Sequence, residues 1–109
     1  MNISADDKLI INKAWDFVKN NKTKLISEKR LIDLRNRAAI AVDSINQNNK
    51  QIAISEAHSI FSVLSIYANE ASKNVLISDR ASIEKAYELA QRFYGLLDES
   101  GIFDDSLHM

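Results

Sequence analysis

The chain has 109 residues, with 14 Lys and Arg, 15 Asp and Glu, two His, two Gly and no Cys or Pro. A chain of this length forms one domain around a single apolar core. The absence of cysteine excludes disulfides, cysteine-based metal sites and a thiol nucleophile. A formal net charge of −1 gives no overall attraction to nucleic acid or to an anionic membrane.

Helices are expected throughout, because sheets and long loops usually place Gly and Pro at their turns. Ser4 followed three residues later by Asp7 is a weak form of the capping box and predicts the start of a first helix. Asn20 and Asn21 predict its end, since Asn is a poor helix former that tolerates cap geometries. The apolar positions of this helix lie on one stripe: Ile10, Ala14, Phe17 and Val18.

Two further helices are predicted over residues 24–45 and 50–72, separated by the polar run 46–49. Both repeat apolar residues at alternating spacings of three and four, which is typical of a helix seam. The helix over 50–72 is apolar on more than one side and is the best candidate for the most buried element. Its additional apolar row consists of Ile52, Val63 and Ile66.

A fourth helix is predicted to begin after a cap at Ser78 or Asp79 and to end before Gly101, a natural residue after a helix end. Residues 75–77 are expected to end the third helix or to connect it to the fourth. The predicted fold is therefore all-α, a compact antiparallel bundle of about four helices. The predicted domain covers residues 1–101, and residues 102–109 form a short acidic C-terminal tail.

No stretch reaches the ~18 consecutive apolar residues that a membrane helix needs. The acidic N-terminus lacks the basic start and the apolar stretch of a secretory signal. We therefore expect a cytoplasmic protein without membrane contact.

Charge is divided unevenly along the chain, with a net +4 over residues 1–42 and −5 over residues 43–109. On a helix, Asp33 is placed to pair with Lys29 and Arg37, so an ordinary solvated face is expected before a nucleic-acid interface. Glu84 and Glu88 are expected to pair at the surface with Arg80, Lys85 or Arg92. The possible basic face comprises Lys22, Lys24, Lys29, Arg30, Arg35 and Arg37.

No residue pattern points to catalysis, a cofactor or a metal. The two histidines, His58 and His108, lie 50 residues apart, and neither belongs to a helical metal motif. Ser55, Ser59 and Ser62 flank His58, but a helical serine beside one histidine is a weak sign of a nucleophile. We expect a protein that is not an enzyme.

Binding of a protein partner is the function that remains. Trp15 and Tyr94 flank their helix stripes, where they either close the edge of the core or form an interaction hot spot. The acidic C-terminal region predicts a stoichiometric inhibitor, of the immunity, antitoxin or phage anti-defence type, that covers the phosphate-binding face of a basic nucleic-acid-acting partner. Its predicted contact residues are Asp98, Glu99, Asp104 and Asp105, with Phe103 as an anchor.

Two alternatives stay open at this point. One is a structural or regulatory module that forms a homo-oligomer through Ile52, Val63 and Ile66. The other is a nucleic-acid or nucleotide binder that uses the basic face, for which we expect affinity to fall steeply with salt.

Overall fold

A computed structural model describes residues 2–48, 51–73 and 79–101, and these residues form four helices and no strand. The helices are α1 (Ala5–Asn20), α2 (Glu28–Asn46), α3 (Ile54–Ala71) and α4 (Arg80–Glu99). The predicted all-α class is confirmed. None of the described helices combines the length and the apolar character needed to cross a membrane.

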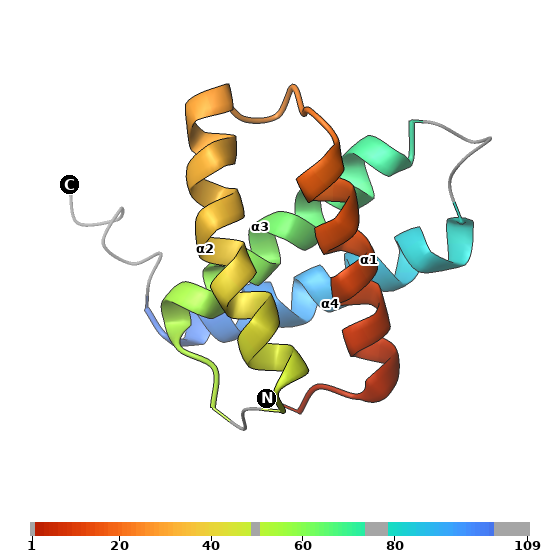
Figure 1. The fold of residues 1–109 in the computed structure, drawn as a ribbon. Coiled ribbons are helices and arrows are strands. Elements are labelled where there is room, and N and C mark those ends of the chain that lie inside the picture. The colour runs from red at the N-terminus through yellow and green to blue at the C-terminus, as the bar shows by residue number, and fades with distance from the viewer. Residues whose placement is uncertain (1, 49–50, 74–78, 102–109) are drawn as a thin grey trace.

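The four helices form two antiparallel hairpins, α1–α2 and α3–α4, and the second hairpin runs across the first (Figure 1). Helix α3 contacts each of the other three helices, whereas α2 and α4 hardly touch one another. Helix α1 also contacts the other three, but α3 packs most extensively, with α2 and α4 on different sides of it.

Helix α1 begins where the sequence predicts. The Ser4 hydroxyl accepts a hydrogen bond from the Asp7 backbone N–H, and the Asp7 carboxylate accepts one from the Ser4 N–H, both at 3.0 Å. This reciprocal pair satisfies two N–H groups that the helix itself leaves without acceptors. The helix ends at Asn20, also as predicted.

Helix α2 begins at Glu28, four residues later than predicted, with Ser27 as its cap. The preceding residues are held elsewhere: the Thr23 hydroxyl and the Lys24 N–H both donate to Glu70 Oε1 on α3, at 2.7 and 3.2 Å. These contacts fix residues 23 and 24 as a connection to α3, and a helix starting at residue 24 would lose them.

Helix α3 begins at Ile54 rather than near residue 50. Ala53 precedes it, and the Ala53 N–H donates to the Glu56 carboxylate at 3.2 Å. Helix α4 is capped by Asp79, one of the two predicted caps, and ends at Glu99 before Gly101, as predicted. Gly101, the residue after the C-cap Ser100, has a φ of 81°. Ser78 and residues 75–77 lie outside the described residues.

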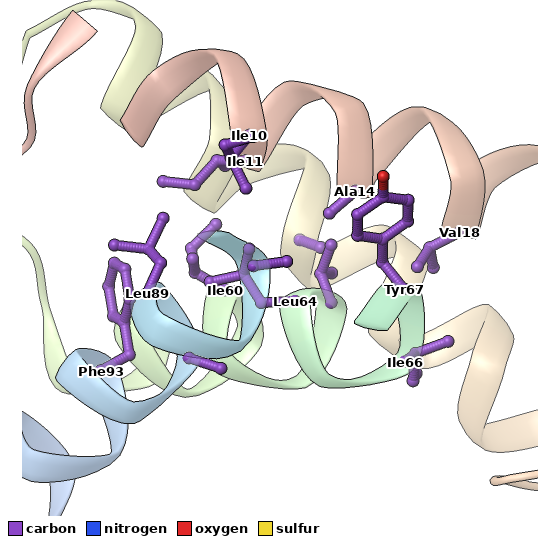
Figure 2. Close-up of a cluster of buried hydrophobic side chains, with 14 of the residues drawn as sticks. Ile10, Ile11, Ala14, Val18, Ile60, Leu64, Ile66, Tyr67, Leu89 and Phe93 are labelled. Atoms are coloured by element: carbon purple, nitrogen blue, oxygen red, sulfur yellow. The ribbon is translucent and has the colours of Figure 1, made fainter. Parts of the chain in front are cut away.

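The core lies where α3 meets the other helices, and α3 is the most buried element, as predicted. Tyr67 points toward α1, beside Ala14 and Val18 (Figure 2). Its ring meets that of Phe17 edge-on, with 5.6 Å between the ring centroids. Burial raises the pKa of the Tyr67 hydroxyl. The largest fully buried side chains are Phe93, Ile11, Ile45, Ile60, Leu64, Leu97, Val18 and Val63.

Candidate functional site

The apolar row predicted for self-association lies inside the single chain. Val63 is fully buried and Ile66 is 5% exposed, while Ile52 is half-buried against the core. Ile66 lies on the side of α3 away from Ile10 and Ile11 (Figure 2). Because the chain itself covers Val63, this residue offers no surface to a second copy, whereas Ile66 still lines a groove beside α2.

The six residues of the possible basic face do not form one surface. Arg35 is half-buried and donates to the backbone carbonyls of Val18 and Asn21, both at 2.9 Å, so it closes the C-terminal end of α1. Arg37 pairs with Asp33 at 3.1 Å, as predicted. The other four are exposed, two in the α1–α2 connection and two in the first turn of α2: Lys22, Lys24, Lys29 and Arg30.

Two of the predicted partner-binding acids, Asp98 and Glu99, are exposed at the C-terminal end of α4. Phe103, Asp104 and Asp105 lie outside the described residues. Successive helix residues turn by about 100°, so Asp98 and Glu99 share the outward side of α4 with Glu84 and Glu88. Among the described residues, none of these four carboxylates forms an ion pair with a lysine or arginine.

The prediction that Arg80, Lys85 or Arg92 pairs with Glu84 and Glu88 is wrong for Arg92, and among the described residues neither Arg80 nor Lys85 forms an ion pair with them. The Arg92 guanidinium instead pairs with Asp7 of α1 at 3.1 Å and donates to the Asn2 carbonyl at 3.0 Å. Burial alone would raise the pKa of Asp7, but the Ser4 N–H and the Arg92 guanidinium outweigh it and hold that pKa below its ordinary value. Lys85 and Arg92 line one depression together with Glu88 of α4 and with Asp6 and Asp7 of α1.

Two tyrosines border the four carboxylates on the side of α4 that faces α3. Tyr87 and Tyr94 are 41% and 49% exposed. The Tyr94 ring contacts Phe61 at 5.9 Å between centroids, and the Tyr87 hydroxyl donates to the Asn69 side chain at 3.4 Å. Both rings are thus supported by α3 while one side stays accessible. We call Glu84, Glu88, Asp98 and Glu99, with Tyr87 and Tyr94, the acidic face of α4.

Trp15, the other aromatic residue predicted to flank a stripe, closes the edge of the core. It is half-buried against the core cluster, and the Lys19 ammonium lies 5.5 Å from its ring centroid. This cation–π contact stays within one turn of α1.

A polar network that the sequence did not predict joins α1 to the start of α4. Lys13 Nζ donates to Ser82 Oγ at 2.9 Å, and Ser82 Oγ donates to Asp79 Oδ2 at 2.8 Å. Lys13 also pairs with Asp79 at 3.4 Å. No local pattern indicates this network, because Lys13 lies 66 and 69 residues from its partners.

The network resembles a serine–lysine pair in composition, but its hydrogen bonds favour a structural role. A serine nucleophile needs an unprotonated base to accept its proton. Here the Lys13 nitrogen donates to Ser82, and the Ser82 hydroxyl donates to the Asp79 carboxylate, so Lys13 does not accept the serine proton. Hydrogen bonds from Ser82 and then Lys13 lower the pKa of Asp79, so this carboxylate stays ionised and caps α4.

The serines around His58 likewise form no nucleophile–base pair. Ser59 Oγ donates to the Ser55 carbonyl at 3.1 Å, and Ser62 Oγ donates to the His58 carbonyl at 3.0 Å. Both hydroxyls are therefore bonded to the backbone of their own helix. Within the residues that the structure describes, no three His, Asp or Glu side chains gather as a metal site.

A groove of about 610 Å³ opens between α2 and α3. Its α3 side carries Ser55, His58, Ser59, Ser62 and Ser65, and its α2 side carries Arg30, Asp33, Leu34 and Arg37. Apolar atoms are supplied also by Leu25, Ile26, Phe61 and Ile66. The side of α3 that lines the groove carries mainly serines, whereas the sides that pack against α1 and α4 carry large apolar residues. The small serine side chains leave the space between α2 and α3 open.

Comparison with family models, with curated proteins and with solved structures found no match to this chain.

Proposed function

We propose that the chain is a small protein-binding protein that acts in the cytoplasm as a stoichiometric inhibitor of a basic, nucleic-acid-acting protein. The observation that carries the proposal is the acidic face of α4. Four carboxylates there lack an ion pair among the described residues, and two half-exposed tyrosines adjoin them. Immunity proteins, antitoxins and phage anti-defence proteins are the functional types that fit this surface.

The placement of the carboxylates is unfavourable for the isolated chain. Asp98 and Glu99 lie at the negative end of the α4 dipole, where each acid costs about 0.3–1 kcal/mol. Glu84 and Glu88 are one turn apart and repel each other by about 0.2–0.5 kcal/mol. A partner's lysines and arginines would relieve both costs, so the arrangement favours a surface that is neutralised on binding.

The two tyrosines would contribute affinity that charge alone does not provide. Electrostatic attraction accelerates association, but hot spots of affinity usually contain Tyr, Trp or Arg in well-packed positions. Tyr87 and Tyr94 are already supported by Asn69 and Phe61, so they lose little rotamer freedom on binding. The sequence predicts Asp104 and Asp105 as further contact acids, with Phe103 as an anchor, and these three lie outside the described residues.

The experiment is a pull-down with the tagged chain from its native host, at low and at high salt, followed by mass spectrometry. We expect one basic protein at a near one-to-one ratio that is lost at high salt. The purified partner's action on nucleic acid should stop when the chain is added in equal amount.

Variants then test the surface. Asp98→Asn with Glu99→Gln, and separately Tyr94→Ala, should each weaken binding by about tenfold or more. Asp16→Asn with Asp43→Asn is the matched control, because it changes the net charge by the same amount on α1 and α2. Equal affinity of both double variants would refute the proposal. Nucleic acid recovered in place of a protein would favour the basic-face alternative.

A further inference from the structure

Small side chains of α3 form the floor of the groove between α2 and α3, so a bound segment can lie close to this helix. Ser55, Ser59, Ser62 and Ser65 recur every three or four residues, so they share one side of α3. The hydroxyls of Ser59 and Ser62 already donate to their own helix, so an occupant need not supply acceptors for them. A floor of small side chains lets another backbone or a large apolar side chain come near α3.

The groove also offers apolar contacts to an occupant. Leu34 and Phe61 are half-buried against the core, and Leu25 at the groove is 48% exposed. Phe61 is held in place from behind by Tyr94 of α4. An inserted leucine or aromatic side chain would cover this surface, and the associated burial is the usual source of affinity in such grooves.

The charges that line the groove select the kind of occupant. Arg30 has no ion pair among the described residues. Arg37 contacts Asp33 through Nε, so its terminal nitrogens keep donors for a second carboxylate. With a single carboxylate, Asp33, against two guanidinium groups, the lining of the groove is complementary to negative charge.

We infer that this groove is a second interaction site, which binds an acidic segment of a protein partner through a leucine or aromatic anchor. The anchor lies on the serine floor beside Phe61, and carboxylates of the segment meet Arg30 and Arg37. The site adjoins the acidic face of α4 through the contact of Phe61 with Tyr94, but its charge preference is the opposite one. It therefore does not depend on the function proposed above.

The test uses three fluorescent synthetic peptides that share a leucine and phenylalanine anchor pair and differ only in their flanking residues, which are Glu, Gln or Lys. We expect the Glu peptide to bind the full chain about tenfold more tightly than the Gln peptide, by anisotropy, and the Lys peptide to bind least. Arg30→Glu with Arg37→Glu should reverse this order. Lys29→Glu is the control, because Lys29 adjoins Arg30 in sequence but does not line the groove.

A second pair of variants locates the binding. Ser62→Leu fills the floor of the groove and should abolish binding of the Glu peptide, whereas Ala39→Leu on the exposed side of α2 should leave it unchanged. Circular dichroism confirms that each variant is folded. Equal binding of all three peptides, no binding of any, or binding that survives Ser62→Leu would overturn the inference.

Two other occupants are outcomes of the same test. Tighter peptide binding after Phe103→Ser, Asp104→Asn and Asp105→Asn would show that the chain's own tail competes for the groove. A solution mass of twice 12.3 kDa that Ser62→Leu returns to 12.3 kDa would identify a second copy instead. Either result would overturn the assignment to a separate partner.

Discussion

At the scale of single residues, Glu70 connects two distant parts of the chain. Its carboxylate accepts hydrogen bonds from the Thr23 hydroxyl and the Lys24 N–H, and Lys73 lies 4.0 Å away. The bond from Thr23 is the main reason why the pKa of Glu70 falls below its ordinary value, against a smaller opposing effect of burial. The ionised form is thus the one that holds the α1–α2 connection on α3.

The lowered pKa of Glu70 predicts a dependence of stability on pH. A carboxyl whose pKa is lower in the folded state stabilises the fold above its unfolded pKa, about 4.3, and loses this contribution as the pH falls through the folded value. We expect Glu70→Gln to be less stable than the parent at pH 7 and to show a smaller loss between about pH 5 and pH 2.

Urea unfolding of both chains across that range measures the difference. Glu84→Gln provides the control, because it removes the same charge at an exposed position without a described ion pair. Parallel pH profiles for the parent and Glu70→Gln would contradict the role of this carboxylate.

At the scale of helices, the sequence predicts an end when the residues that make it are close together. Ser4 and Asp7 are three residues apart, and the predicted start of α1 is confirmed. The start of α2 depends on Glu70, which lies 46 residues from Lys24, so the local pattern placed it too early. The hydrogen bonds from Arg35 to the end of α1 likewise cannot be predicted from helical periodicity.

The caps of α1 and α3 give a paired prediction of stability. Ser4→Ala removes the acceptor for the Asp7 N–H and should lower the free energy of unfolding by about 1 kcal/mol. Helix α3 has no side-chain acceptor at its cap, although the Ala53 N–H already donates to Glu56. Ala53→Ser supplies that acceptor and should raise the free energy of unfolding by up to about 1 kcal/mol. Urea midpoints at constant slope measure both changes. Effects of the same sign would contradict this account of the caps.

At the scale of the whole molecule, α3 is the element on which the others depend. Leu64 is fully buried at its centre, and Leu64→Ala should lower the free energy of unfolding by about 2–5 kcal/mol. Ile40 on α2 is 68% exposed, so Ile40→Ala should change the free energy of unfolding by less than about 0.5 kcal/mol. Denaturant unfolding of the two variants compares them directly, and similar losses would place the core elsewhere.

The candidate surfaces were predictable only in part, for the same reason as the helix ends. The exposure of Asp98 and Glu99 follows from the periodicity of α4, and the structure agrees with it. The negative charge that remains at Glu88, one turn from Arg92, depends on Arg92 pairing instead with Asp7, 85 residues away. The groove depends on how α2 packs against α3, which helical spacing leaves undetermined.

The central place of α3 has a consequence for synthesis on the ribosome. Helices α1 and α2 emerge first, and the α3 surface against which both pack does not yet exist. Arg92, which pairs with Asp7 beside the cap of α1, is added later still. At about 5–20 residues per second, the nascent α1–α2 hairpin exposes its apolar side for several seconds before it can be covered. The N-terminal half of the chain is therefore most exposed to chaperones and proteases during its own translation.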